Sequence, residues 1–334
     1  MSGMEPVRCA VVGLGMIGQE HAAVLARSPL AELLACCDVD PQATARAPAG
    51  VPVTADLGEL LDLPELEAVF ICTPQETHRQ IATRALEHGL FVFCEKPVAR
   101  TLADADALLA MPQAQAGLLV VGHTLRFSPD YLAVHEAVAG GAVGRVVSMA
   151  ARRCIPGFEG KLIAGRTNLA IEVGVHDIDI MRWLAGDIET VYTEVARMGV
   201  TGPGLTDALA GTIRFASGAV ATIEINWIMP SESALKSDYR LAVFGTEGSA
   251  FAEFHAPAVR VFGAEAPRTG WRDDVHGSQS GALVTEDEHF LGVVRGIRSW
   301  PLTLADARAA MAAAIALDES AASGRPVRVA EGEG

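Results

Sequence analysis

The sequence predicts two domains: an N-terminal α/β domain with a Rossmann-like, doubly wound parallel sheet, and a C-terminal α+β domain with a large, mostly antiparallel open sheet. The first observation is a series of short apolar runs that alternate with helix-forming segments early in the chain. The second is a later series of longer segments, rich in β-branched residues and separated by turn signals. The third is the length: 334 residues, of which 50% are apolar, predict two packed cores rather than one.

The first domain is predicted from five apolar runs with helical segments between them. Strands that helices cover on both faces carry continuous apolar sequence, because neither face meets water. Alternating strands and helices imply right-handed crossovers and a mainly parallel sheet. The predicted strands are Val7–Val12, Leu33–Cys37, Ala68–Cys72, Leu90–Cys94 and Leu118–Gly122, and the predicted helices are Met16–Ala26, Glu76–His88 and Thr101–Met111. We expect residues 1–125 to form this domain.

The second domain is predicted from a change of pattern after Tyr131, which begins a helix that ends near Gly140. Turn signals such as Ala216–Gly218 and Thr246–Gly248 favour an antiparallel meander. The predicted strands are Arg145–Cys154, Ile188–Ala196, Leu209–Phe215, Ala219–Trp227 and Arg240–Phe244, and the closing helices are Glu286–Gly296 and Leu304–Ser320. We expect residues 126–334 to form this domain, with the closing helices packed either within it or back on the first domain. The Gly-, Ser- and charge-rich stretch Glu265–Ala282 is predicted to be a mobile loop.

Charge and cysteine usage argue against several classes of partner. A formal charge of -15 and a pI near 5.0 repel phosphate backbones and anionic lipids, so we expect no nucleic-acid or membrane partner. No basic N-terminal region precedes an apolar stretch, and no segment reaches the roughly eighteen apolar residues of a membrane span. The cysteines mostly lie in apolar, strand-like runs, which predicts reduced thiols and a cytoplasmic protein. They are Cys9, Cys36, Cys37, Cys72, Cys94 and Cys154.

Three glycines follow the first predicted strand in the spacing G-x-G-x-x-G and open the next helix. In this context Gly13 permits a tight turn, Gly15 lets the backbone approach a pyrophosphate, and Gly18 allows close packing of helix on strand. Free amides at the helix start, where Met16 and Ile17 lie, attract negative charge. The spacing therefore predicts a dinucleotide site, and a purely structural turn is the alternative.

Asp38 ends the second predicted strand, at the distance of about 20 residues from the motif where a carboxylate binds the adenosine ribose. A carboxylate there repels a 2′-phosphate. Because Val39 and Asp40 follow with no adjacent arginine, we predict NAD as the cofactor and NADP as the less favoured one. The alternative is that Asp38 only forms the turn before Pro41.

Further motifs give the chain a family resemblance. They are Ile71–Pro74 with His78, Phe93–Pro97 with its Glu-Lys-Pro sequence, Gly122–Pro129, Gly144–Val146, Val175–Asp179 and Gly245–Gly248. With these motifs the chain resembles the glucose–fructose oxidoreductase, inositol dehydrogenase and rhizopine-catabolism (Gfo/Idh/MocA) family over essentially its whole length. The resemblance implies a two-domain dehydrogenase that acts on a sugar or cyclitol.

The resemblance also implies roles for individual residues. The residues implied to line the cofactor, besides the glycine motif and Asp38, are Cys72, Thr73, Pro74, His78, Glu95 and Lys96. For His78 a helix-surface histidine is the alternative, and Glu95 could instead anchor Lys96. In the family a lysine, an aspartate and a histidine commonly act together; the matching positions are Lys96, Glu172 and His176, with Glu in place of Asp.

Residue chemistry supports two of these roles separately. Lys96 follows a strand at the carboxyl edge of the predicted sheet, where open α/β folds bind ligands, and burial beside oxidised nicotinamide would disfavour its ammonium form. Glu172 and His176 are spaced i and i+4 on a predicted helix from Asn168 to Ala185, so a carboxylate can orient an imidazole. We expect His176 to be the general base, with Lys96 sharing the proton or polarising the forming carbonyl. Glu172 could orient His176, bind substrate or only pair along the helix.

Three more residues are predicted to line the substrate cleft with Lys96, Glu172 and His176; they are Arg126, Tyr131 and Arg153. Arginine forks and aromatic faces suit hydroxyl-bearing ligands. Arg152 and Arg153 point to opposite faces of a strand, so at most one of them faces the cleft. Salt bridges and packing on the sheet face are the alternatives.

We therefore predict a metal-independent, NAD-dependent dehydrogenase that transfers a hydride between nicotinamide and a secondary alcohol or carbonyl of a sugar, cyclitol or related polyol. The scattered histidines form no metal-ligand pattern. The alternatives are a sugar–sugar oxidoreductase or an NAD-using glycosidase with a tightly held cofactor, and a non-catalytic NAD-binding regulator. An open sheet with an apolar face predicts a homodimer or homotetramer through the C-terminal sheet.

Overall fold

The computed structural model describes residues 5–163, 166–230, 237–253, 271–275 and 277–330, and the chain divides into two compact units. The first unit comprises Met1–Phe127 and Gly270–Arg308, and the second comprises Ser128–Thr269 and Ala309–Gly334. Each helix within the described residues is too short or too polar to cross a membrane.

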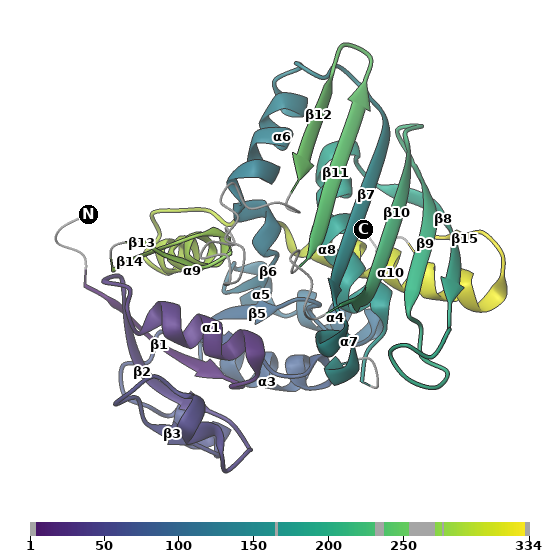
Figure 1. The fold of residues 1–334 in the computed structure, drawn as a ribbon. Coiled ribbons are helices and arrows are strands. Elements are labelled where there is room, and N and C mark those ends of the chain that lie inside the picture. The colour runs from purple at the N-terminus through teal and green to yellow at the C-terminus, as the bar shows by residue number, and fades with distance from the viewer. Residues whose placement is uncertain (1–4, 164–165, 231–236, 254–270, 276, 331–334) are drawn as a thin grey trace. The chain divides into compact units, whose positions relative to one another are not determined.

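The first unit is built on a six-stranded parallel sheet, which confirms the predicted doubly wound fold (Figure 1). The strand order β3-β2-β1-β4-β5-β6 reverses its direction beside β1. In such sheets ligands bind outside the carboxyl ends of the strands, at this reversal. The strands are β1 (Val7–Val12), β2 (Ala31–Cys37), β3 (Val53–Thr54), β4 (Ala68–Ile71), β5 (Phe91–Glu95) and β6 (Leu119–Gly122).

Helices cover this sheet because its strands are apolar on both faces. Every residue of β4 and β6 is buried, and the rings of Phe70 and Phe93 stack with centroids 5.1 Å apart. Side-chain caps from Asp56 and Thr101 fix the starts of α2 and α4. The helical elements between the strands are α1 (Met16–Leu25), η1 (Ala43–Arg46), α2 (Leu57–Leu61), α3 (Gln75–Glu87), α4 (Leu102–Leu109) and α5 (Pro112–Gln115), and η2 (Thr124–Phe127) follows β6.

A segment from late in the chain completes the first unit. It forms the hairpin β13 (Asp273–Val275) and β14 (Ser278–Ser280), followed by α9 (Ala282–Val294). The first part of the predicted mobile loop Glu265–Ala282, up to residue 270, lies outside the described residues. From Asp273 the prediction of a loop is wrong, because the chain forms a hairpin. Asp274 of this hairpin lies 2.7 Å from Arg27, which follows α1.

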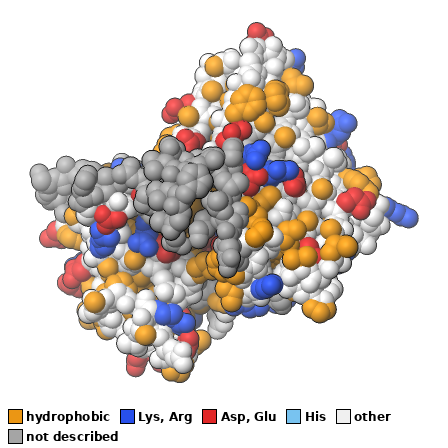
Figure 2. Space-filling view, viewed as in Figure 1, with side chains coloured by type: hydrophobic (Ala, Val, Ile, Leu, Met, Phe, Trp, Pro, Cys, Tyr) orange, Lys and Arg blue, Asp and Glu red, His pale blue; other side chains and the backbone are white. Residues whose placement is uncertain are grey.

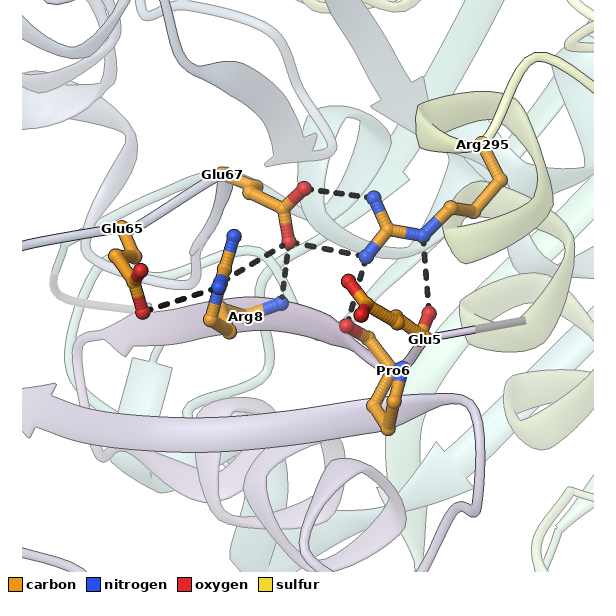
Figure 3. A network of polar contacts seen from close by, with 6 residues as sticks. All are labelled: Glu5, Pro6, Arg8, Glu65, Glu67 and Arg295. Carbon is orange, nitrogen blue, oxygen red and sulfur yellow. Dashed lines mark hydrogen bonds and ion pairs between the residues drawn. The ribbon is translucent and has the colours of Figure 1, made fainter. Parts of the chain in front are cut away.

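A polar network joins the end of α9 to the start of the sheet (Figure 3). Arg295 donates hydrogen bonds of 2.6 and 3.0 Å to the two carboxylate oxygens of Glu67. It also donates to the main-chain oxygens of Glu5 and Pro6, at 3.1 and 2.7 Å. Glu67 in turn accepts the main-chain N–H of Arg8 at 2.9 Å. The C-terminal end of α9 is therefore fixed to the beginnings of β1 and β4.

The second unit holds a seven-stranded, mostly antiparallel sheet, as predicted. Its strand order is β12-β11-β7-β10-β9-β8-β15, and β7 and β10 pair in parallel. The short edge strands β12 and β15 were not predicted. The strands are β7 (Val146–Pro156), β8 (Ile188–Ala196), β9 (Ala208–Phe215), β10 (Val220–Met229), β11 (Asp238–Gly245), β12 (Ser249–Glu253) and β15 (Val327–Arg328).

One face of this sheet is covered and the other is exposed. Burial alternates along the strands: Leu209 and Ile223 are buried, whereas Thr212 and Thr222 are exposed. Figure 1 shows α8 and α10 behind the strands, and a Cβ on Gly211 would lie 3.2 Å from Leu317 of α10. The helices of this unit are α6 (Pro129–Ala139), α7 (Gly157–Ile163), α8 (Val175–Ala185) and α10 (Leu304–Ser323, which begins in the first unit), with a π-helical turn η3 (Ala170–Gly174).

The exposed face of this sheet carries apolar side chains among charged ones. Figure 2 shows hydrophobic groups over these strands. The register places Phe244, Phe251 and Val220 on this face, and the rings of Phe244 and Phe251 contact each other edge to face with centroids 5.6 Å apart. Phe244 is 45% exposed and Phe251 is 58% exposed. This face is therefore only partly polar.

Candidate active site

The glycine motif forms the tight turn between β1 and α1. Gly13 has a φ of +94°, and a Cβ there would lie 2.7 Å from the carbonyl oxygen of Cys72. At Gly18 a Cβ would lie 1.9 Å from the oxygen of Gly13. At Gly15 a Cβ would meet nothing within 4 Å, and no side chain caps α1, which begins at Met16. Packing thus requires glycine at the first and third positions, and the second leaves open space at a helix start.

Asp38 follows β2 and holds the glycine loop in place. Its Oδ2 accepts the Leu14 N–H at 2.7 Å, and its Oδ1 accepts the Asp40 N–H at 2.9 Å. Asp38 therefore does form the turn, and it also contacts the loop ahead of α1. Nη2 of Arg46 lies 2.8 Å from Oδ2 of Asp40 and 3.7 Å from Oδ2 of Asp38. The sequence did not predict this arginine, because it lies on η1 rather than next to Asp38.

Cys72, Thr73 and Pro74 follow β4 at the same edge of the sheet, and Pro74 precedes the first residue of α3. His78 of α3 is buried, with its ring nitrogens 2.7 Å from the oxygen of Thr73 and 2.9 Å from the oxygen of Pro97. Burial lowers the pKa of His78, and the two carbonyl oxygens do not offset this effect. His78 therefore connects the loops after β4 and β5, and the alternative of a helix-surface histidine is wrong.

Glu95 is the last residue of β5, and Lys96 follows it. Oε1 of Glu95 lies 3.0 Å from Nε2 of His21 on α1, and Oε2 accepts the Lys96 N–H at 3.0 Å. Nδ1 of His21 lies 2.7 Å from Oδ1 of Asp287 on α9. These three side chains, His21, Glu95 and Asp287, are buried and form what we term the His21 cluster.

The charges within the His21 cluster depend on one another. Burial lowers the pKa of His21, but the charge of Asp287 and the hydrogen bonds to both carboxyls outweigh burial and raise that pKa well above 6.5. Burial raises the pKa of Glu95, but the hydrogen bond and charge of His21 and the charge of Lys96 outweigh burial and lower it. Burial raises the pKa of Asp287. Glu95 is therefore held as a carboxylate directly before Lys96.

Arg126 lies in η2 and is buried. Its Nη1 donates to the oxygen of Pro301 at 3.1 Å. In the same turn, Thr124 donates to Oε2 of Glu286 on α9 at 2.6 Å, and burial raises the pKa of Glu286 well above 4.5. Both contacts attach this turn to the late segment of the first unit.

Glu172 and His176 lie in the second unit, where a π turn runs into α8. The predicted helix over Asn168–Ala185 is present from Leu169, but η3 near its start has π instead of α geometry. Oδ1 of Asn168 accepts the Ile171 N–H at 2.9 Å, and a Cβ on Gly174 would lie 2.5 Å from Cδ1 of Ile225. Both Glu172 and His176 are half-buried. Such turns within helices are frequent at functional sites.

Arg153 and Tyr131, predicted to bind substrate, belong to a buried cluster of the same unit. Arg153 binds Asp177 through hydrogen bonds of 2.5 and 3.2 Å and donates to Tyr131 Oη at 3.4 Å. Its guanidinium lies 4.3 Å from the ring centroid of Tyr239. Burial lowers the pKa of Arg153, but the charge of Asp177 outweighs burial and raises it. Because Asp177 follows His176, this pair fixes the start of α8 against β7.

The first unit brings the predicted residues of four strands to one edge. The loops after β1, β2, β4 and β5 carry Gly15, Asp38, Thr73 and Lys96. The sequence reasoning missed His21 and Asp287. The buried residues of α1 include Gly18, His21, Ala22 and Leu25, a spacing that marks one helix face and could have placed His21 inside.

These residues fit NAD. The open space at Gly15 and the uncapped start of α1 suit a pyrophosphate, and the Asp38 carboxylate suits ribose hydroxyls. Within the described parts of the chain, no group of three or more His, Cys, Asp or Glu residues could hold a metal ion.

Comparisons with known proteins agree with this geometry. Residues 7–123 match the family described as "Oxidoreductase family, NAD-binding Rossmann fold", and residues 131–251 match the GFO/IDH/MocA C-terminal domain. Inositol 2-dehydrogenase 2 of Saccharopolyspora erythraea is 30% identical over 96% of this chain and 95% of its own length. The scyllo-inositol 2-dehydrogenase (NAD(+)) of Bacillus subtilis is 29% identical over 97% and 96%. The crystal structure of GenD2 from gentamicin A biosynthesis in complex with NAD is 27% identical, covers 98% of this chain and 97% of its own, and has a TM-score of 0.82.

Proposed function

The chain belongs to the Gfo/Idh/MocA oxidoreductase family, and we propose that it transfers a hydride between NAD and a secondary alcohol of a cyclitol or closely related polyol. The family profiles cover both parts of the chain, so the protein is an NAD-dependent oxidoreductase that acts on CH–OH groups. The substrate class is supported by relatives of matching length that are named as dehydrogenases of inositols.

One observation carries the proposal. The glycine loop, Asp38 and Lys96 share the carboxyl edge of one parallel sheet, beside the reversal of strand order. An amine at this edge can reach the ligand that the edge binds. A purely structural turn would need neither the open space at Gly15 nor a lysine held by a buried carboxylate.

The proposed roles divide the chemistry between side chains. NAD, when bound, supplies the hydride acceptor at nicotinamide C4. His176 accepts the hydroxyl proton, Glu172 orients the His176 imidazole, and Lys96 binds the substrate oxygen. Arg153 supports this site by holding Asp177 at the start of α8, and Tyr131 accepts a hydrogen bond from Arg153. Arg126 is a further residue that we assign to substrate binding.

The preference for NAD over NADP is supported by two carboxylates. Asp38 and Asp40 both lie within 4 Å of Arg46, so the charge of this arginine is already compensated. A 2′-phosphate placed here would meet Asp38 at close range. We expect kcat/KM to be at least about fivefold higher with NAD, since like charges a few ångströms apart repel by about 1 kcal/mol or more.

The test is a screen of the purified protein for NADH formation with myo-inositol, scyllo-inositol and common sugars, in parallel with NAD binding. Net NADH from a cyclitol supports the proposal. Binding of NAD without turnover on any substrate would favour a regulator. Oxidation of one sugar with reduction of another and no net NADH would favour a sugar–sugar oxidoreductase.

A substitution tests the proton carrier. His176→Ala should lower kcat by roughly a hundredfold while leaving NAD affinity nearly unchanged, because only the proton-transfer group is removed. His88→Ala is the matched control, since His88 is exposed at the end of α3. Unchanged turnover in His176→Ala would remove His176 from the mechanism.

Assembly and location belong to the same proposal. The partly apolar face around Phe244 and Phe251 supports a homodimer or homotetramer through the second sheet. A monomeric mass at equilibrium sedimentation would contradict it. The six cysteines are buried and free, which supports the expected reducing, cytoplasmic location.

A further inference from the structure

The His21 cluster places three ionisable side chains in the core of the first unit. The His21 ring lies 5.7 and 5.2 Å from the rings of Phe70 and Phe93, and it is fully buried. Burial of charged groups costs free energy unless each is paired. The proposed hydride transfer uses neither His21 nor Asp287 directly, so the placement of these two residues calls for a reason.

The geometry fixes which atom of His21 faces Glu95. A neutral imidazole has one N–H and a charged one has two. With Glu95 held as a carboxylate, an ionised Asp287 means that His21 is charged and donates from both nitrogens. If Asp287 is protonated, it donates to Nδ1, and His21 keeps its proton on Nε2. In both states Nε2–H donates to Oε1 of Glu95, so Asp287 sets the orientation of the donor.

Glu95 passes this constraint to Lys96. Its second oxygen accepts the Lys96 N–H at 3.0 Å, which fixes the main chain where it leaves β5. The carboxylate also interacts with the charge of Lys96, because that charge helps to lower the pKa of Glu95. The starting point of the Lys96 side chain and the charge behind it thus both depend on Glu95.

Asp287 can orient His21 because α9 is itself fixed. Its C-terminal end is held by Arg295 through Glu67 and the main chain of Glu5 and Pro6 (Figure 3). A helix held at this end presents Asp287 in one position.

We propose that His21, supported by Asp287, is a positioning residue for Lys96: its Nε2–H holds Glu95 as an oriented carboxylate, and Glu95 holds the main chain and the charge of Lys96. This inference rests on the proposed dehydrogenase function. It assigns a role to a histidine of α1 and to an aspartate of α9, 266 residues away in sequence.

The groups that surround Glu95 leave His21 as its buried cation. The titratable groups that interact with it are His21, Cys72, His78, Cys94, Lys96, Glu286 and Asp287. Burial raises the pKa of the two thiols and of Glu286 and lowers that of His78, so burial favours the uncharged form of each of these groups. Without His21, burial would therefore drive Glu95 toward its protonated form.

The test compares three variants of the full chain. His21→Leu removes the donor, His21→Gln keeps an amide donor without the charge, and Glu286→Gln is the matched control. Glu286 is as buried as Asp287 and adjacent to it, but it binds Thr124 instead of His21. For each variant we would measure kcat against pH with the best cyclitol from the screen, and NAD affinity by fluorescence.

We expect His21→Leu to lower kcat about tenfold or more at neutral pH, with NAD affinity changed less than about twofold. The loss should shrink as the pH rises, because alkaline pH ionises Glu95 again. His21→Gln should lose less, and Glu286→Gln should match the wild type. In the cofactor-free wild type, the ring resonances of His21 should not titrate between about pH 6 and 8.

Two results would overturn the inference. One is wild-type kcat and pH profile in both His21 variants. The other is a loss that is equal at every pH and is shared by Glu286→Gln, which would mark a general packing effect. If His21→Leu does not fold, His21→Gln against Glu286→Gln decides by the same criteria. A wild-type protein that binds NAD and turns over nothing would instead defeat the proposed function, and the absence of titration at His21 would still be measurable.

Discussion

Each unit of the molecule holds a buried ion pair beside a proposed catalytic residue, and the two pairs differ in their cation. In the first unit, Glu95 precedes Lys96 and pairs with His21. In the second, Asp177 follows His176 and pairs with Arg153. Both carboxylates lie at the junction between a regular element and the residue that is proposed to act.

The cation determines how each pair responds to pH. A guanidinium keeps its proton at every accessible pH and binds a carboxylate through two parallel hydrogen bonds, as Arg153 does with Asp177. An imidazole can lose its proton, and His21 contacts two carboxyls with one bond each. The cation of the pair in the second unit therefore keeps its charge, and only the Asp177 carboxyl, whose pKa burial raises, can change its protonation state. In the first unit the cation can lose its proton as well.

The largest effect on stability should come from breaking the Arg153–Asp177 pair. Arg153→Met leaves the Asp177 carboxylate buried without its partner, which should lower the free energy of unfolding by about 3–5 kcal/mol. Urea unfolding followed by circular dichroism measures this loss. The loss should be largest at neutral pH and shrink toward acidic pH, because burial raises the pKa of Asp177 and a protonated carboxyl needs no cation. A loss that is equal at every pH would show that it arises from packing and not from the unpaired charge of Asp177.

The neighbouring residue provides the control for this prediction. Arg152 points to the other face of β7, where its guanidinium lies 2.6 Å from Glu224 and its side chain is 40% exposed. An exposed pair contributes about 0–1 kcal/mol, so Arg152→Met should be nearly neutral. Equal losses in the two variants would show that burial does not distinguish the pairs.

The sequence predicted the strands of both sheets for opposite reasons. Strands such as β4 are continuously apolar because both faces are covered, and strands such as β9 alternate because one face is exposed. The edge strand β12 was missed because its five residues include exposed Phe251 and Glu253 and show no clear pattern. The π turn η3 was missed because spacing alone does not distinguish it from an α-helix. Its geometry comes with the close approach of Gly174 to Ile225.

The candidate site was predicted where its residues lie in local motifs. The glycine loop, Asp38 and Glu95–Lys96 each follow a strand, so their common edge follows from the topology. The His21 cluster did not follow, because His21 and Glu95 are 74 residues apart and His21 and Asp287 are 266 apart. Only the fold of the late segment onto α1 brings them together. The partner of a buried charge is a property of packing, which sequence spacing does not encode.

The smaller effect concerns how the stability of the first unit depends on pH, and the variant Glu286→Gln tests it. The pKa of Glu286 is raised well above 4.5 in the folded protein, so the stability that its neutral form provides is complete below about pH 4.5 and is lost as the pH rises through the folded pKa. Glutamine cannot ionise. The melting temperature of Glu286→Gln should therefore exceed that of the wild type by a margin that grows from about pH 5 to pH 8. Each unit by which the folded pKa is raised corresponds to about 1.4 kcal/mol in the free energy of unfolding. His21 also has a raised pKa and loses its contribution in the same direction, but it is present in both proteins and cancels in the difference. Parallel melting curves across this range would show that Glu286 is not held neutral in the folded protein.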